Sequence, residues 1–162
     1  MTSMLDSYVS FVKTESPEPI ETIIINELIA DIIKTVDKNN IDLVLNEKSR
    51  VKSSGRQIQL KRAFNNIIDN SQRYAKKIEI NLYKNEKDCV IEFNDDGEGI
   101  PTNKYEDVFK PFFTLDPSRN KLKGESGLGL TITRDIIRSH GGDVKLSASN
   151  LGGLRLKVLL PL

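Results

Sequence analysis

The stretch Cys89-Val90-Ile91-Glu92-Phe93-Asn94-Asp95-Asp96-Gly97-Glu98-Gly99-Ile100-Pro101 passes from alternating apolar residues into an acidic turn that contains two glycines. The alternation predicts a β-strand over residues 89–93, and a similar run at 78–83 predicts its antiparallel hairpin partner. Glycine permits a sharp turn or a close approach of the backbone to a planar ligand. A carboxylate at the strand end can accept a hydrogen bond from an exocyclic amine. Taken alone, a plain acidic β-turn explains the same residues equally well.

A long helix is predicted just before this hairpin, over residues 57–75. Its apolar face consists of Leu60, Phe64, Ile67, Ile68 and Ser71. Asn66, Asn70 and Arg73 share another face, because positions i, i+4 and i+7 stack along a helix. Amide oxygens are ligands that Mg²⁺ accepts beside water and phosphate oxygens, and Arg73 could reach a phosphate. A solvated polar face is the alternative for this helix by itself.

The stretch Gly124-Glu125-Ser126-Gly127-Leu128-Gly129-Leu130-Thr131 leads into a second helix, which begins at 127 or 128 and ends at 139, before Gly141-Gly142. Backbone N–H groups at a helix N-terminus can bind an anion, and glycine allows the torsion angles that such a nest needs. The stretch lacks the Gly-Lys-Ser/Thr of a Walker A loop and the third glycine of a dinucleotide fingerprint. A flexible glycine linker is the alternative.

The remaining pattern completes an α+β fold, a two-layer sandwich with helices on one face of a sheet. Strands are predicted at 20–25 and 41–45, with a closing hairpin of 143–147 and 154–160. Asn26 is predicted to cap a helix that carries Leu28, Ile29, Ile32, Ile33 and Val36. The irregular stretch 94–126, with a short helical piece near 104–109, is long enough to be a binding loop or lid.

Length and composition describe one soluble globular domain of 162 residues. The 24 basic and 23 acidic residues give a net charge of +1, so no nucleic-acid partner is expected. The single cysteine, Cys89, excludes an internal disulfide framework and is expected to be a buried thiol in a reducing compartment. No apolar stretch approaches the ~20 residues of a membrane span.

Four motifs in order resemble the N, G1, F and G2 boxes of histidine kinase catalytic domains. They are Asn66-x-x-x-Asn70, Asp95-x-Gly97-x-Gly99, Phe109-x-Pro111-Phe112 and Gly127-x-Gly129. The resemblance spans about residues 19–162, and the run at 70–74 is similar to the EnvZ-type osmosensor kinases, although Ser71 replaces their usual alanine. It implies the Bergerat (GHKL) fold, with a mixed, mostly antiparallel sheet, and it implies ATP and Mg²⁺ as ligands.

The resemblance also assigns roles to individual residues. Asp95 would bind the adenine amino group, Asn66 and Asn70 would hold Mg²⁺, and Arg73 would lie near the γ-phosphate. The catalytic residues would be Asn66, Asn70 and Arg73. The nucleotide-binding set would be Asn66, Asn70, Arg73, Tyr74, Asp95, Gly97, Gly99, Ile100, Phe112, Arg119, Gly127, Leu128, Gly129 and Leu130. Residues 110–126 would form the ATP lid, with Arg119, Lys121 and Lys123 as its cations.

By the same resemblance, residues 1–16 would be the tail of a dimerisation helix and its linker, and residues 17–162 the catalytic domain. The single histidine, His140, is expected to have a local role at a helix end, because a phosphoacceptor of this family sits in mid-helix before an acidic residue. The expected partner is therefore a phosphoacceptor domain of the same parent protein, with a response regulator further downstream. We expect a monomeric cytoplasmic fragment of a homodimeric, inner-membrane parent.

Two other functions remain as alternatives to a kinase. ATP-hydrolysing members of the GHKL group resemble one another in placing a glutamate, as general base, four residues before the Mg²⁺ asparagine. Asn66 occupies that position here, and a neutral amide cannot accept the proton of an attacking water. The other alternative is a nucleotide-sensing module without catalysis, although all four motifs are intact.

Overall fold

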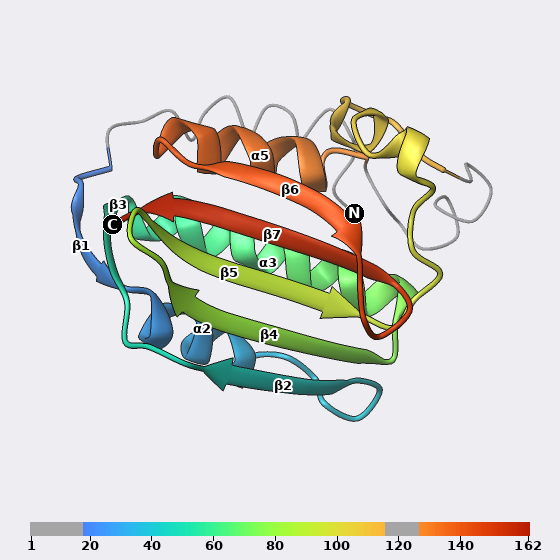
Figure 1. Ribbon diagram of the computed structural model, residues 1–162, viewed down its shortest axis with the longest axis horizontal. Coiled ribbons are helices and arrows are strands. Elements are labelled where there is room, and N and C mark those ends of the chain that lie inside the picture. Colours follow the sequence, from blue (N-terminus) through green and yellow to red (C-terminus); the bar gives the residue numbers. More distant parts are fainter. Residues whose placement is uncertain (1–17, 116–126) are drawn as a thin grey trace.

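A five-stranded sheet forms one layer of the domain (Figure 1). A computed structural model describes residues 18–115 and 127–162. The sheet order is β2-β4-β5-β7-β6, with the bounds β2 Asp42–Glu47, β4 Lys77–Lys84, β5 Asp88–Asp95, β7 Leu154–Pro161 and β6 Asp143–Ala148. β2 pairs with β4 in parallel, and the other three pairings are antiparallel. The predicted mixed, mostly antiparallel sheet is therefore confirmed.

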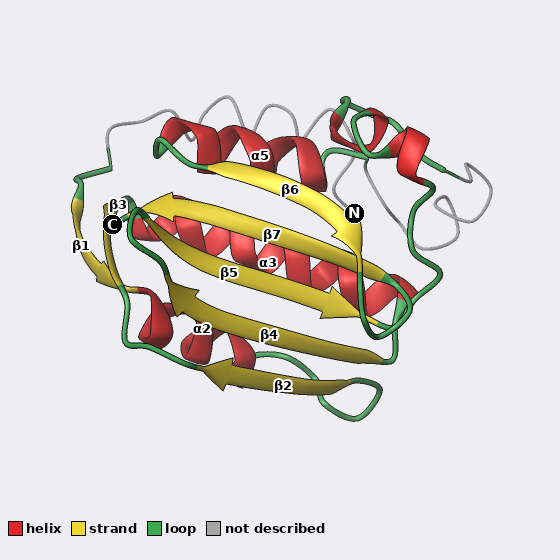
Figure 2. Cartoon of the chain, in the orientation of Figure 1, coloured by secondary structure: helices red, strands yellow, loops and turns green. Residues whose placement is uncertain are grey.

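Among the described residues, three helices cover one face of this sheet (Figure 2): α2 (Ile25–Lys34), α3 (Gln57–Tyr74) and α5 (Gly129–Ser139). α3 lies between the other two and contacts both. Its Phe64 ring lies 6.2 Å from the ring of Phe93 on β5, and both side chains are fully or almost fully buried. Burying an aromatic side chain of this size stabilises a fold by ~1.5–3 kcal/mol. The two-layer α+β sandwich expected from the sequence is confirmed.

A small second sheet pairs β1 (Glu21–Ile24) with β3 (Lys52–Gly55). The sequence did not predict β3, because Lys-Ser-Ser-Gly shows no apolar alternation. The strand forms through its pairing with β1, and the buried Ser53 hydroxyl also donates to the Pro161 carbonyl at 2.7 Å. This contact joins β3 to the end of β7.

The predicted N-cap role of Asn26 is wrong. The helix already begins at Ile25, and Asn26 lies inside it as a buried residue. Its amide nitrogen donates to Glu47 and to the Ser49 carbonyl, and its oxygen accepts from the Val51 amide at 2.8 Å. Asn26 therefore satisfies the backbone of the β2–β3 connection, and this tertiary role competes with the local capping preference of asparagine.

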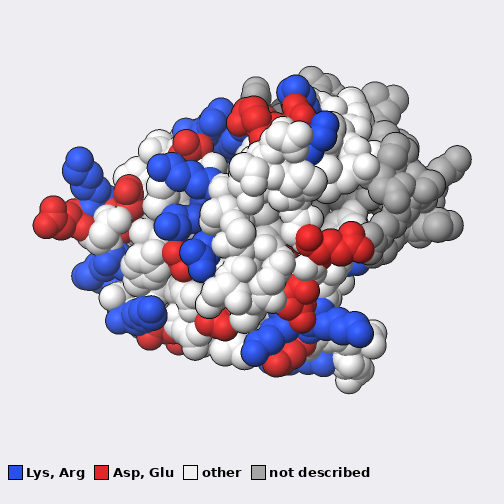
Figure 3. All heavy atoms as spheres, turned by 45° about the vertical axis from the view of Figure 1, so that its right-hand side comes forward, with Lys and Arg blue, Asp and Glu red and all other residues white. Residues whose placement is uncertain are grey.

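Basic and acidic side chains are interspersed over the face of the described residues shown in Figure 3, so neither sign of charge dominates that face. Between β5 and α5, the described residues include two short 3₁₀ helices, η1 (Thr102–Lys104) and η2 (Asp107–Phe109), near the one helical piece predicted from the sequence. Within residues 18–115 and 127–162, no helix has the length and apolar character to span a membrane. The predicted dimerisation-helix tail lies outside the described residues.

Candidate nucleotide-binding site

A pocket of about 660 Å³ lies where α3, the end of β5, η2 and the start of α5 meet. Ten of the predicted nucleotide-binding residues line it: Asn66, Asn70, Arg73, Tyr74, Asp95, Gly99, Ile100, Gly127, Gly129 and Leu130. They come from three segments that are well separated in the sequence. The fold therefore brings the N-box, G1-box and G2-box residues to one site.

The helix α3 supplies the polar wall of the pocket through Asn66, Asn70 and Arg73. The amide nitrogen of Asn66 is buried and has no hydrogen-bond partner in the described residues. Buried polar groups are nearly always paired, so an unsatisfied one at a pocket wall is a feature that a ligand can explain. Asn66 itself lines the pocket, so its amide group lies where a bound ligand could contact it.

The Asp95 carboxylate is held in a fixed orientation at the end of β5. Its Oδ1 atom accepts hydrogen bonds from the Gly97 and Leu154 amides, each at 3.0 Å. The residue is 6% exposed, and this burial raises the pKa of Asp95, while the two amide hydrogen bonds and the charge of Asp96 act on it less strongly. Both fixing bonds use the same oxygen, so the second oxygen can serve as an acceptor for a ligand that enters the pocket.

Gly153 is a site residue that the sequence analysis missed. A Cβ atom added there would overlap Asp95 Oδ1 and would lie 2.6 Å from the Gly97 amide nitrogen. The Gly153 amide also donates to the Asp95 carbonyl at 3.1 Å. Only glycine lets the loop between β6 and β7 approach the carboxylate this closely. No local pattern could reveal it, because the two residues are far apart in the chain.

Gly127 and Gly129, treated as one nest in the sequence, have different structural roles. Gly127 has a φ of +76°, its carbonyl accepts from the Phe112 amide at 2.9 Å, and a Cβ there would lie 2.8 Å from Phe112 Cα. Gly129 begins α5, and a Cβ there would meet nothing within 4 Å. Gly127 is thus required by the fold, whereas the space beside Gly129 is open.

Of the other four predicted residues, three are described by the structure and are not on the pocket wall. Leu128 is buried in the core, and Gly97 packs beside the end of α3, where a Cβ would lie 2.7 Å from the Tyr74 carbonyl oxygen. Phe112 is 48% exposed and has a φ of +63°, which is uncommon for a residue other than glycine. Arg119, with Lys121 and Lys123, lies outside the described residues. Nucleotide contact by these residues stays a prediction.

Further residues outside the predicted binding set line the pocket: Asp69, Glu98, Pro101, Lys104, Val108, Phe113, Thr114, Leu115 and Leu154. Among them, Phe113, Thr114 and Leu115 belong to the predicted lid segment at 110–126, of which the structure describes residues 110–115. Asp69 directly precedes the second N-box asparagine, and burial raises the pKa of its carboxyl group while nearby Arg73 opposes the shift. Helical spacing would have placed Asp69 beside Asn66 and Arg73. Leu154 had no such indication, because it comes from the C-terminal hairpin.

Comparison with known proteins identifies the family to which the chain belongs. Residues 55–162 match the family described as histidine kinase-, DNA gyrase B-, and HSP90-like ATPases. The chain is 40% identical over 104 residues to the sensor histidine kinase CpxA of Escherichia coli, covering 64% of this chain and 23% of CpxA. It is 37% identical over 108 residues to the sensor histidine kinase GtrS of Pseudomonas aeruginosa, covering 66% and 22%. The chain thus spans less than a quarter of these relatives.

Solved structures confirm the fold. The mycobacterial sensor histidine kinase MprB superposes with a TM-score of 0.77 at 24% identity, covering 88% of this chain and 97% of that one. The catalytic domain of histidine kinase ThkA gives a TM-score of 0.75 at 24% identity, covering 88% and 97%. The chain belongs to the histidine kinase-, gyrase B- and HSP90-like ATPase family, and its sequence relatives are sensor histidine kinases.

Proposed function

We propose that this domain binds Mg²⁺-ATP and transfers the γ-phosphoryl group to a histidine on a separate dimerisation domain of a two-component sensor kinase. The observation that carries the proposal is the convergence of Asn66 and Asn70, Asp95, and Gly127 and Gly129 on one pocket. These groups match the three parts of the ligand. Asp95 can accept from the adenine amine, the asparagines can hold the metal, and the start of α5 can face the phosphates.

The donor set at the pocket suits Mg²⁺ carried with a nucleotide. In residues 18–115 and 127–162, no cluster of three His, Cys, Asp or Glu side chains is arranged to hold a metal. Mg²⁺ is commonly bound by few protein oxygens together with water and phosphate oxygens. Asn66 and Asn70 lie one turn apart on α3, both line the pocket, and their amide oxygens are ligands of the kind this role needs. Bound there, the ion would neutralise charge on the phosphates.

Phosphoryl transfer depends on positioning and on neutralising charge. An imidazole nitrogen of the acceptor would form the new P–N bond while the bond from the γ-phosphorus to the leaving oxygen of ADP breaks. The attacking nitrogen is the unprotonated one, and the proton on the other ring nitrogen would pass to solvent. Arg73 and the N-terminus of α5, both at the pocket, would stabilise the charge on the transferred group. The acceptor must come from another domain, since His140 is engaged elsewhere.

The proposal places this chain within a longer protein. Residues 1–16 would be the end of a dimerisation helix with its linker, and residues 17–162 the catalytic domain. The fragment would be monomeric and cytoplasmic, and the parent a homodimer in the inner membrane. A response regulator would receive the phosphoryl group from the acceptor histidine. The similarity to sensor histidine kinases supports this arrangement, with the osmosensor subgroup as the more specific prediction.

Hydrolysis of ATP is the second candidate, and one observation favours it. Asp69 lines the pocket beside Asn70, and burial raises the pKa of its carboxyl group above the ordinary value. A carboxylate with a raised pKa is a better proton acceptor for water than an ordinary one. Asp69 could therefore take over the role of the glutamate that Asn66 replaces. In a nucleotide-sensing module, by contrast, ATP would bind without any reaction.

Incubation with γ-labelled ATP, alone and with a cognate acceptor domain, separates these functions. A kinase gives acid-labile label on the acceptor, slowly and in proportion to concentration, because no covalent connection raises the effective concentration.

Asn70→Ala should abolish transfer, whereas Asn81→Ala should leave it unchanged, because Asn81 faces Asn46 on the sheet away from the pocket. Phosphate release without acceptor that disappears in Asp69→Asn would establish the hydrolase instead. ATP binding with neither product would establish the sensing module.

A further inference from the structure

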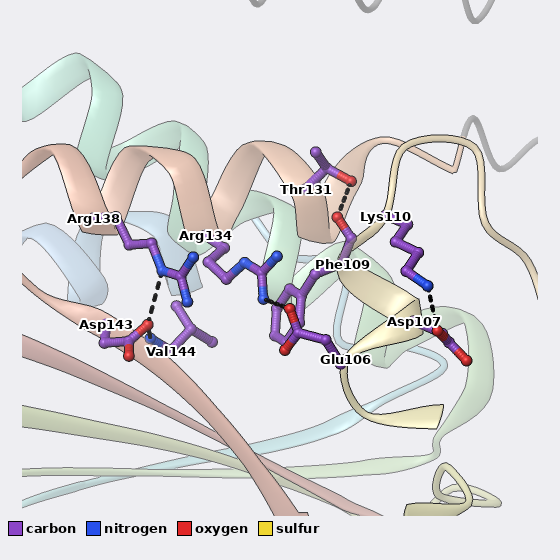
Figure 4. A network of polar contacts seen from close by, with 9 residues as sticks. All are labelled: Glu106, Asp107, Phe109, Lys110, Thr131, Arg134, Arg138, Asp143 and Val144. Atoms are coloured by element: carbon purple, nitrogen blue, oxygen red, sulfur yellow. Dashed lines mark hydrogen bonds and ion pairs between the residues drawn. The ribbon is translucent and has the colours of Figure 1, made fainter. Parts of the chain in front are cut away.

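Arg134 on α5 makes two direct contacts with the segment that contains η2 (Figure 4). Its guanidinium carbon lies 4.2 Å from the centre of the Phe109 ring, and its Nη1 atom lies 2.7 Å from the Glu106 carboxylate. Nearly one turn earlier on α5, the Thr131 hydroxyl donates to the Phe109 carbonyl at 2.7 Å. We infer that Arg134 is a positioning residue, which fixes η2 against α5 and so holds one wall of the nucleotide pocket in place.

The stacking on Phe109 is the larger part of this contact. The Arg134 side chain is only 15% exposed, so its guanidinium is largely removed from water, whereas the Glu106 side chain is 77% exposed. A desolvated cation–π contact contributes more than an ion pair with an exposed partner, which solvent screens. Phe109 itself is buried, with 4% of its surface exposed. Arg134 thus lies over a ring that is almost fully buried.

The position of η2 matters because η2 and its flanks form pocket wall. Val108 within η2, Lys104 before it and Phe113 after it all line the cavity, and so do Gly129 and Leu130 at the start of α5. A 3₁₀ turn of three residues has little stability of its own. Contacts with α5 therefore hold it in place, and Arg134 and Thr131 supply two of them.

Arg138 offers a matched control one turn further along the same helix. It also forms an ion pair, with Asp143 at 3.1 Å, but both side chains are about half exposed. Neither Arg138 nor Asp143 lines the pocket. Figure 4 shows the two arginines extending from α5 to different partners. Losing either arginine removes one charge and one ion pair from α5, so their comparison isolates the contact with η2.

The test measures binding of Mg²⁺-ATP by calorimetry to the folded 162-residue chain, and it rests on nucleotide binding at this pocket. Arg134→Ala should weaken binding about fivefold to tenfold, and Arg138→Ala by less than about twofold. Arg134→Lys, which keeps a cation over the ring, should recover part of the loss. Glu106→Gln should stay close to wild type. Hydrogen exchange of the Phe109 and Lys110 amides should accelerate in Arg134→Ala without nucleotide, and should not change in Arg138→Ala.

The outcomes separate two kinds of failure. If the wild-type chain does not bind ATP, the proposed function fails. If the wild type binds and Arg134→Ala binds equally well, the positioning role is overturned. Equal losses in Arg134→Ala and Arg138→Ala would also overturn it, because they would indicate a general effect on α5. A loss confined to Arg134→Ala, with rescue by lysine and faster exchange in η2, supports it.

Discussion

The Nε2 atom of His140 accepts a hydrogen bond from the Arg56 amide at 3.0 Å, and so the end of α5 is joined to the start of α3. The Nδ1 atom of the same ring lies 2.8 Å from the Ile136 carbonyl, to which it donates, since a carbonyl can only accept. Both ring nitrogens are therefore engaged. On its other side, the start of α3 is held by the Glu18 carboxylate, which accepts from the Ile58 and Gln59 amides.

We predict that His140 is structural and carries no phosphoryl group. His140→Ala should lower the free energy of unfolding by ~1–3 kcal/mol, because the Arg56 amide loses its acceptor. ATP binding by the folded variant should be little changed, since His140 does not line the pocket. Urea denaturation and calorimetry measure the two quantities. Acid-labile label on His140 after incubation with ATP would contradict this role.

Asp95→Asn should separate adenine recognition from folding. The asparagine oxygen can still accept from the Gly97 and Leu154 amides, but its NH₂ group replaces the oxygen that would accept from the adenine amine. Affinity for ATP should fall by ~1.5–3 kcal/mol, about tenfold or more. Stability at neutral pH should not fall, because the variant no longer buries a carboxylate whose pKa is raised.

The comparison variant is Asp95→Ala, which loses both functions of the side chain. It should bind ATP as weakly as Asp95→Asn and should also unfold at a lower urea concentration, because two amides lose their acceptor. Wild-type affinity should also decline as the pH falls through the raised pKa of Asp95, because the protonated carboxyl no longer offers two acceptor oxygens. Unchanged calorimetric affinity in a folded Asp95→Asn protein would reject this assignment.

Alanine at the two G2-box glycines should have different effects. Gly129→Ala adds a methyl group to open space, so thermal stability should be retained while ATP affinity drops about tenfold, if phosphates approach this helix terminus. Gly127→Ala should lower stability as well, by at least ~1–2 kcal/mol, because its φ of +76° disfavours a side chain and its Cβ would meet Phe112. Gly129→Ala with wild-type affinity would place the phosphates elsewhere.

Glu92 on the open face of the sheet should contribute a pH-dependent part of the stability. Burial acts to raise the pKa of its carboxyl group, but the hydrogen bond from Tyr83 at 2.8 Å and the cations Lys157 and Arg155 outweigh burial, so the pKa is lowered. Burial and the same contact raise the pKa of Tyr83 to about 12. Because the folded pKa of Glu92 is depressed, its contribution is present at neutral pH and is lost as the pH falls through that pKa.

Glu92→Gln should therefore cost about 1 kcal/mol of unfolding free energy at pH 7. The difference from wild type should shrink as the pH falls below the ordinary glutamate value of 4.5. Urea denaturation across pH 3 to 7 measures both, and the change is expected at the acidic end of this range, below pH 4.5. A constant difference over that range would show that Glu92 acts through packing rather than through its charge.

Local patterns in the sequence were sufficient for most elements of this fold. The hairpin at 78–93, the helix at 57–75 and the closing hairpin all have strong periodicity, and the structure places them within one or two residues of the predicted bounds. The four motifs likewise indicated a nucleotide site through their residue types, their spacing and their order along the chain. Periodicity is informative here because one face of each element is buried in a single core. The buried positions are therefore apolar at regular spacing in the sequence.

What the sequence could not determine depends on contacts between distant segments. Asn26 was predicted to be a helix cap because capping preference is local. Its side chain instead forms hydrogen bonds with Glu47, Ser49 and Val51, which are distant in the sequence. The strand β3 exists through pairing with β1 rather than through its own composition.

The site shows the same division between sequence and tertiary structure. Residue type and spacing made Asp95, Asn66, Asn70 and the two G2-box glycines candidates, and the family resemblance assigned their nucleotide roles. The closeness of Gly153 to Asp95, the engagement of both nitrogens of His140 and the stacking of Arg134 on Phe109 were decided by tertiary structure alone. Each of these joins segments whose approach is set by the packing of the sheet and helices, and neither spacing nor composition encodes such a distance.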